Sequence, residues 1–121
     1  MQVSTAKASV DARDLPPYAH AMELAHVRSP DAKPPKEAQA RRRLEDEGFE
    51  VVCWSDPPGR VYTSHAHERD ESLWMIAGSM TFVIEGRSYR LEAGDRLTLP
   101  RGVVHEARAH DAGARYLIGE R

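Results

Sequence analysis

Glycine, proline, histidine and glutamate residues in the middle of this 121-residue chain form one spaced pattern, which constrains the fold more than any other feature. Its nine members are, in chain order, Gly59, His65, His67, Glu71, Gly78, Gly94, Pro100, Gly102 and His105. Glycine and proline are typical of sharp connections between strands. Three imidazoles and one carboxylate are donors that suit a divalent metal ion. The pattern therefore predicts a backbone path and a metal site together.

Short runs of strand-forming residues alternate with turn residues from position 49 onward. The expected strands cover residues 49–54, 61–67, 72–77, 80–85, 88–91, 96–99, 103–110 and 115–118. Strands at this spacing, separated by glycine and proline, are typical of an all-β sandwich or barrel. Glu85 ends one run and Gly86 follows it, and this pair predicts a tight hairpin. We therefore expect an all-β fold, built as a small antiparallel barrel.

The first part of the chain predicts an arm and one short helix. Two prolines at positions 34 and 35 precede a run of helix-forming residues over 36–47, and Gly48 follows it. Proline near the first turn and glycine just past the last turn are typical of helix boundaries. Residues 1–33 show no sustained period. We expect an arm over 1–33, either flexible or packed on a partner subunit, then a helix within 34–48 and a barrel over 49–121.

Composition restricts the partners and the compartment. The net charge of −2 gives no overall field that would gather nucleic acid or an anionic membrane. No apolar run approaches the roughly 20 residues that a membrane-spanning helix needs, and a single cysteine, Cys53, excludes an intrachain disulfide. We expect no nucleic-acid or membrane partner and a cytoplasmic location. Because a small barrel has sheet edges to cover, we also expect a homodimer.

The histidine spacing predicts that several metal ligands share one face. His65 and His67 are two residues apart, so both imidazoles point the same way if they lie on a strand. Glu71 has the same parity if the intervening turn preserves the direction, and His105 comes from a later strand. Such a donor set suits one ion of Fe, Mn, Ni or Zn. A closed structural zinc site would usually be rich in cysteine, so we expect one or two open positions for a small-molecule ligand.

The two halves of the pattern resemble the two motifs of the cupin superfamily, in the form found in small single-domain bacterial cupins of the type-2 conserved barrel. The first half reads Gly59-x5-His65-x-His67-x3-Glu71-x6-Gly78, and the second reads Gly94-x5-Pro100-x-Gly102-x2-His105. The resemblance covers residues 49–118. It implies a jelly-roll barrel with the metal ion inside one open end, held by His65, His67, Glu71 and His105.

The chain departs from the cupin pattern at one position. The second motif often ends with an asparagine four residues past its histidine, where this chain has Ala109. That asparagine is not a metal ligand in the family, so the resemblance still implies the same ligand set. The departure leaves the polarity of the pocket undefined.

Several other residues have two interpretations. Cys53 is expected to be a small buried apolar side chain, and the alternative is a thiol in the pocket. Trp54 and Trp74 suit the core or a subunit contact better than stacking on a substrate. Tyr62 and Tyr116 are candidates for offering a hydroxyl group to a ligand, and the sequence does not decide between this role and packing.

The function hypotheses belong to different classes, because fold alone does not determine function. The first is a metal-dependent enzyme of the dioxygenase, isomerase or lyase type that acts on a small oxygen-rich or anionic metabolite. The second is a non-catalytic barrel that binds or senses a small ligand or a metal, and the third is a purely structural barrel. The sequence shows no acid–base pair outside the expected metal ligands.

Overall fold

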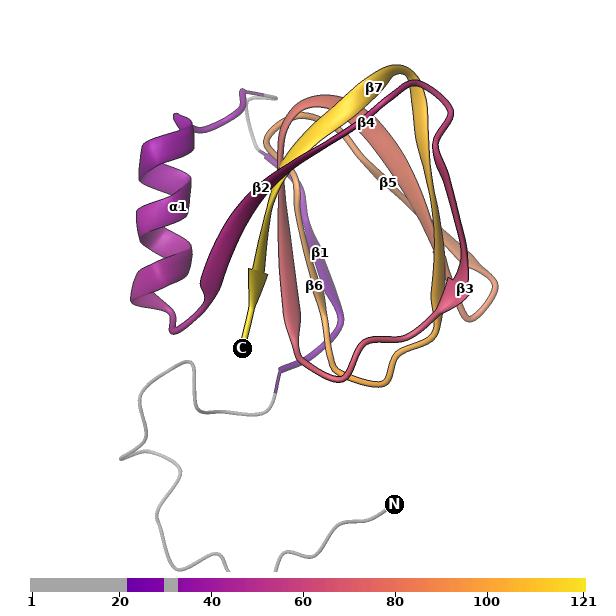
Figure 1. The fold of residues 1–121 in the computed structure, drawn as a ribbon, viewed down its shortest axis with the longest axis horizontal. Helices are drawn as coiled ribbons and strands as arrows, with labels where there is room; N and C mark the ends of the chain where they lie inside the picture. Colours follow the sequence, from indigo (N-terminus) through magenta and orange to yellow (C-terminus); the bar gives the residue numbers. More distant parts are fainter. Residues whose placement is uncertain (1–21, 30–32) are drawn as a thin grey trace, which may run out of the picture.

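A bent antiparallel sheet forms the barrel, and one helix packs on its outside (Figure 1). The computed structural model describes residues 22–29 and 33–121. The elements are, in chain order, β1 (Ala25–Val27), α1 (Glu37–Asp46), β2 (Glu50–Asp56), β3 (Val61–His65), β4 (Glu71–Ile84), β5 (Arg87–Leu91), β6 (Arg96–Leu99) and β7 (His105–Glu120). The predicted all-β jelly-roll fold and the predicted helix are confirmed.

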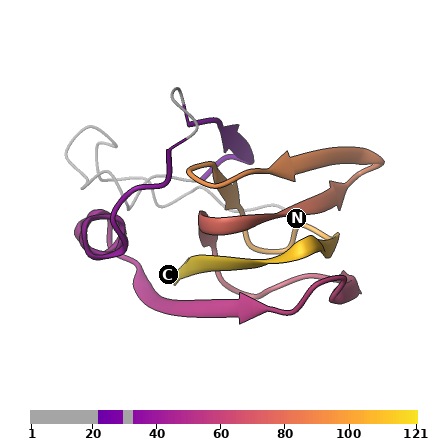
Figure 2. The ribbon, with the colours of Figure 1, turned by 90° about the horizontal axis from the view of Figure 1, so that it is seen from above.

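Two long strands, β4 and β7, run through both halves of the barrel. The first part of β4 pairs with β6 and with the last part of β7, while β1 and β2 form the edges of this half. The second part of β4 pairs with β5 and with the first part of β7, which also pairs with β3. Figure 1 shows the halves as opposite walls, and Figure 2 shows the strands of the first half side by side, from β1 to β2.

The prediction of separate strands over 72–77 and 80–85, and over 103–110 and 115–118, is wrong, because each pair is one bent strand. Gly78 lies at the bend of β4 and Gly113 lies at the bend of β7, with φ angles of 73° and 76°. The pairing of β4 with β7 shifts register on both sides of Gly78. A Cβ atom on Gly78 would lie 2.0 Å from the carbonyl oxygen of Gly113. The backbones of β4 and β7 approach each other so closely here that only glycine fits. At these positions glycine bends each strand instead of ending it.

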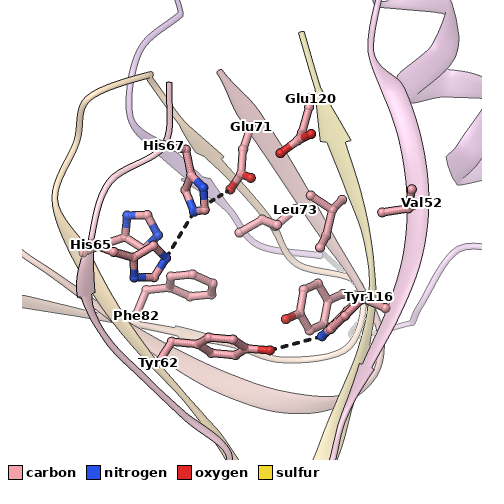
Figure 3. Close-up of a pocket in the computed structure, with 12 residues that line it drawn as sticks. Val52, Tyr62, His65, His67, Glu71, Leu73, Phe82, Tyr116 and Glu120 are labelled. Carbon is pink, nitrogen blue, oxygen red and sulfur yellow. Dashed lines mark hydrogen bonds and ion pairs between the residues drawn. The ribbon is translucent and has the colours of Figure 1, made fainter. Parts of the chain in front are cut away.

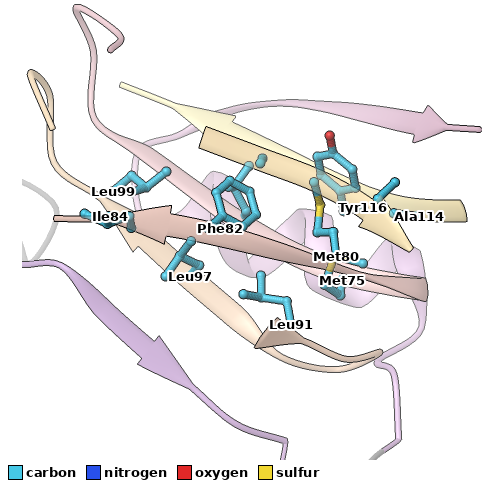
Figure 4. Packing of buried hydrophobic residues seen from close by; sticks show 12 residues of the cluster. Met75, Met80, Phe82, Ile84, Leu91, Leu97, Leu99, Ala114 and Tyr116 are labelled. Atoms are coloured by element: carbon cyan, nitrogen blue, oxygen red, sulfur yellow. The ribbon is translucent and has the colours of Figure 1, made fainter. Parts of the chain in front are cut away.

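Apolar side chains fill the space between the two walls (Figure 4). Alternate residues of the strands point inward, as the period of a strand requires. The largest fully buried apolar side chains inside the barrel are Met75, Met80, Ile84, Leu91, Leu97 and Leu99. This core occupies part of the interior and leaves the end near β2 and β3 for a pocket.

A second apolar cluster joins the helix to the outer face of the first half. Ala40 and Leu44 of α1 are buried against Phe49 and Leu117. Cys53 packs against the same cluster and is outside the pocket lining, but it is only half-buried, so the expected full burial is wrong. No helix in the described part of the chain is long and apolar enough to cross a membrane.

Part of the expected arm belongs to the barrel sheet of its own chain. Strand β1 pairs with β6, with Ala25 opposite Thr98. The buried Asp95 carboxylate accepts hydrogen bonds from His26 Nε2 and from the Ser29 backbone N–H, at 3.2 and 2.9 Å. Burial alone would raise the pKa of Asp95, but these hydrogen bonds hold it below its usual value. The barrel sheet therefore begins before residue 34, whereas residues 1–21 and 30–32 lie outside the described residues.

Candidate metal centre

Three histidines from two strands and a loop form one cluster. His65 on β3 pairs in register with His105 on β7, so the two imidazoles are direct neighbours with ring centroids 4.4 Å apart. His67 follows two residues after His65, and its ring centroid lies 4.8 Å from that of His65 and 5.1 Å from that of His105. One nitrogen atom from each ring lies within 4.8 Å of the others. The cluster can therefore hold a metal ion.

Backbone carbonyl groups orient two of the imidazoles. His65 Nδ1 donates to the carbonyl oxygen of Thr63 at 2.6 Å, and His105 Nδ1 donates to that of Val103 at 2.9 Å. A carbonyl oxygen only accepts, so the proton of each neutral ring is on Nδ1 and the lone pair is on Nε2. This arrangement is the usual outer-shell support of a metal-binding histidine. In both rings, the lone pair on Nε2 is therefore available to bind a metal ion.

The separation of the nitrogen atoms also fits an ion. The Nε2 atoms of His65 and His67 lie 3.1 Å apart. Two ligand nitrogens about 2.1 Å from one ion, at a right angle to each other, are separated by about 3 Å. The donor set and its spacing therefore fit a transition metal ion.

The turn of the second motif is tied to the loop of the first. The N–H of Gly102 donates to the carbonyl oxygen of His67 at 2.9 Å. The Asp70 carboxylate accepts the N–H of Arg101 at 2.8 Å. These bonds bring the segment that leads into His105 next to the segment that carries His67.

Glu71 lies beside the histidines but outside their cluster. Its Oε1 atom is 3.6 Å from His67 Nε2, and the residue is only 5% exposed. It pairs in register with Glu120 of β7. Burial and the neighbouring Glu120 carboxyl raise the pKa of Glu71 to about 8. A cation at the histidines would favour the ionised carboxylate instead.

The electrostatics of the imidazoles favour their neutral, metal-binding form. Burial lowers the pKa of His67, and the neighbouring His65 lowers it further. Burial also lowers the pKa of His105, and His65 and His67 add to this effect, against the hydrogen bond to Val103. Both rings therefore stay neutral to a lower pH than an ordinary histidine does, as metal binding requires.

A pocket of about 320 Å³ lies against the histidines inside the barrel (Figure 3). Its wall is mostly aromatic and aliphatic, with the polar groups at a few positions. The lining residues are Val52, Trp54, Tyr62, His65, His67, Glu71, Leu73, Phe82, His105, Tyr116, Ile118 and Glu120. The four residues of the predicted metal site thus face the same cavity, and Trp54 lines it too, whereas Trp74 packs near the helix.

The sequence analysis missed a buried hydrogen-bond network beside the pocket. Asp56, which is 5% exposed, accepts hydrogen bonds from Trp54, Tyr62 and Tyr116. Burial and Asp56 raise the pKa of Tyr62 and that of Tyr116, so both phenols stay protonated. In the sequence, Asp56 precedes two prolines and a glycine. That context indicates an ordinary turn and conceals the role.

The second missed residue is Glu120, near the end of the chain. Glu71, Glu120 and Glu50 form one row across β4, β7 and β2. Arg69 forms ion pairs with Glu50 at 2.9 Å and with Glu120 at 3.8 Å. Glu120 shares strand parity with Tyr116 and Ile118, and this parity was the one available signal that it faces the pocket.

Comparisons with known proteins agree with this fold. Residues 52–118 match the family model described as the Cupin domain. No curated protein sequence matches the chain. KdgF from Halomonas sp. is 29% identical, with a TM-score of 0.54 over 60% of this chain and 69% of that one. An RmlC-like cupin from Shewanella frigidimarina NCIMB 400 is 22% identical, with a TM-score of 0.53 over 60% and 65% of the two chains, which supports the fold alone.

A larger solved structure also matches. Oxalate decarboxylase of Bacillus subtilis, which contains Mn(II) centers, is 30% identical to this chain, with a TM-score of 0.53. The match covers 60% of this chain and only 20% of the decarboxylase. The likeness is therefore to one part of a much longer protein.

Proposed function

Since the chain belongs to the cupin family, with more than half of it matched by the family model, we propose that it is a metal-dependent enzyme acting on a small oxygen-rich or anionic metabolite. The observation that carries the proposal is the cluster of three histidines on the wall of a pocket that also contains two carboxyl groups. Of the dioxygenase, isomerase and lyase types, the pocket favours the isomerase and lyase types.

The proposed metal ligands are His65, His67, Glu71 and His105, and the proposed ion is Fe, Mn, Ni or Zn. The Mn(II) centers of the similar oxalate decarboxylase support a metal in this fold. Three neutral imidazoles and one carboxylate leave a dipositive ion with a formal excess of about one positive charge, so the site favours an anionic oxygen ligand. When bound, the ion supplies Lewis-acid polarisation of a carbonyl or carboxylate oxygen.

Glu120 is the side chain that we propose for proton transfer. It lines the pocket next to Glu71, yet it is outside the proposed ligand set. Isomerases and lyases move a proton to or from carbon, whereas metal-centred oxygen chemistry needs no such group. A carboxylate in this place therefore favours the proton-transfer reactions.

A non-catalytic binding barrel is the second candidate. Most of the pocket wall is apolar, with side chains such as Leu73, Phe82 and Ile118, and a wall of this kind suits retention of a small molecule as well as turnover.

The homodimer, the cytoplasmic location and the division into arm, helix and barrel remain predictions.

The metal-dependent enzyme would convert a substrate, whereas the non-catalytic binding barrel would not. We expect metal-loaded protein, incubated in D₂O with hydroxy acids, keto acids and sugar acids, to exchange protons on carbon or to form product, as detected by NMR. Glu120→Gln should slow this reaction by about 100-fold or more, the usual contribution of general acid–base catalysis. Glu50→Gln is the matched control, because Glu50 lies in the same row and pairs with Arg69 but is outside the pocket lining.

Three outcomes would change the proposal. Binding of a small molecule without its conversion would show that the protein is the non-catalytic binding barrel. A Glu120→Gln variant as fast as the unchanged protein would remove Glu120 from the reaction. Metal-dependent oxygen uptake with thiols, diketones or catechols would assign the dioxygenase type.

A further inference from the structure

The pocket has two chemically different polar regions. The Glu71 and Glu120 carboxyl groups lie in one region, and the hydroxyl groups of Tyr62 and Tyr116 lie in another, as Figure 3 shows. The ring of Tyr62 is 6.4 Å from that of His65, centroid to centroid, so the hydroxyl region lies within the reach of a small ligand held at the histidines. The second region belongs neither to the proposed metal ligands nor to the proposed proton donor.

In this second region, the Asp56 carboxylate accepts a hydrogen bond from every N–H and O–H group of the tryptophan and tyrosine side chains. Its Oδ1 atom accepts the indole N–H of Trp54 at 3.0 Å and the Tyr62 hydroxyl at 2.5 Å. Its Oδ2 atom accepts the Tyr116 hydroxyl at 2.7 Å. A phenol hydroxyl has one proton, so what remains on each tyrosine oxygen is lone-pair density. The Tyr62 oxygen also accepts the Trp54 N–H, at 3.1 Å, so the Tyr116 oxygen is the more open acceptor. The tyrosines therefore present hydrogen-bond acceptors to the pocket and no donor.

The charge of the region has the same consequence. Three neutral donors hold the Asp56 carboxylate, and no ion pair within residues 22–29 and 33–121 reaches it. A buried negative charge without a cation disfavours a second anion nearby. The Arg60 guanidinium lies over the Tyr62 ring, 4.7 Å from its centroid, but Arg60 is outside the pocket lining. A ligand carboxylate next to the two tyrosine hydroxyls would therefore find no proton to accept and no cationic side chain in the pocket wall.

We infer that Asp56, Tyr62 and Tyr116 determine ligand specificity, and that the pocket takes a small hydroxy acid with its anionic oxygens at the histidines and a hydroxyl donor at the tyrosines. A dicarboxylate of the same length is rejected. This inference rests on the proposed metal-dependent function and names the ligand class of the same site.

Asp56→Asn reverses the hydrogen bonds in a predictable way. Two donors, the Trp54 N–H and the Tyr62 hydroxyl, meet at the Oδ1 position, so the asparagine is expected to place its carbonyl oxygen there. Its amide nitrogen then faces Tyr116 and donates to that hydroxyl. The Tyr116 proton is released toward the pocket, where it can donate to a carboxylate. The variant also lacks the buried negative charge.

The test uses ligands that differ only at one end. 4-Hydroxybutyrate, succinate and butyrate share a four-carbon skeleton and one carboxylate, and the corresponding series with three to six carbons allows for the length of the pocket. Affinities are measured by calorimetry on protein shown beforehand by elemental analysis to contain its metal ion. For at least one length, we expect the hydroxy acid to bind about tenfold more tightly than the diacid and the unsubstituted acid, the size of one hydrogen bond.

The variants separate specificity from a merely structural role. Asp56→Asn should reduce or invert the ratio of hydroxy-acid to diacid affinity. Tyr116→Phe should remove the preference for the hydroxy acid over the unsubstituted acid without increasing the affinity for the diacid. Tyr62→Phe replaces Asp56→Asn as the second variant if Asp56→Asn fails to fold. Equal affinities within every length, absence of binding by all hydroxy acids at millimolar concentration, or an unchanged ratio in folded variants would overturn the inference. Failure to bind metal in the preliminary analysis would instead refute the proposed function.

Discussion

Metal affinity should fall by more than about 100-fold when His105 is replaced by alanine. Loss of an outer-shell partner alone typically costs 10- to 100-fold in metal affinity, and His105 is proposed as a ligand itself. It also lies directly opposite His65 in the β3–β7 pairing, so its removal leaves the cluster with two imidazoles. Titration of metal-free protein with Mn²⁺ or Zn²⁺, followed by calorimetry, measures the loss.

His110→Ala is the matched control for this experiment. His110 lies on the same strand, but its ring nitrogens contact Ser79 and Thr81, both at 2.7 Å, away from the cluster. We expect unchanged metal affinity in this variant. Because His105 is only 3% exposed, circular dichroism of both metal-free variants must show that they are folded. Equal metal affinity of folded His105→Ala protein and the unchanged protein would contradict the proposed site.

Gly78→Ala should have the largest effect on stability. A methyl group there would lie 2.0 Å from the carbonyl oxygen of Gly113, a backbone atom that can move only if β4 and β7 separate. The positive φ of 73° adds about 1–2 kcal/mol of strain for any residue with a Cβ atom. We expect a loss of more than about 3 kcal/mol, a large part of the stability of a small domain. Guanidinium unfolding followed by tryptophan fluorescence gives the value.

Gly59→Ala separates the two causes. Gly59 has nearly the same φ, 76°, but nothing lies within 4 Å of the added methyl group. This variant should lose only the strain, about 1–2 kcal/mol. If both variants lost the same free energy of unfolding, the close crossing of β4 and β7 would not be what requires glycine at position 78.

The spacing of the residues and its resemblance to the cupin motifs predicted that His65, His67 and His105 come together, and the structure confirms this cluster, whereas a metal ion bound to it remains a prediction. His65 ends β3 and His67 follows in the loop two residues later, while the pairing of β3 with β7 brings His105 beside His65. The hairpin at Glu85 and Gly86 was equally local, and the structure confirms it with positive φ angles at both residues. Local rules suffice where a feature depends on a few consecutive residues.

Features that depend on distant contacts were not accessible in this way. A glycine that ends a strand and a glycine that bends one look alike in sequence, and only the approach of Gly113 to Gly78 distinguishes them. Asp56 resembled a turn residue because its partner Tyr116 lies 60 positions further along the chain. Glu120 follows the last predicted strand, over 115–118, and only its pairing with Glu71 places it at the pocket.

Metal analysis tests the central claim most directly. The full chain should be purified without chelator and without nickel affinity resin, and its metal content measured by mass spectrometry against protein concentration. We predict about one ion of Fe, Mn, Ni or Zn per chain, as one cluster of three histidines with the Glu71 carboxylate beside it requires. Protein that contains no metal, and that takes up none of these four ions when they are added, would contradict the metal centre.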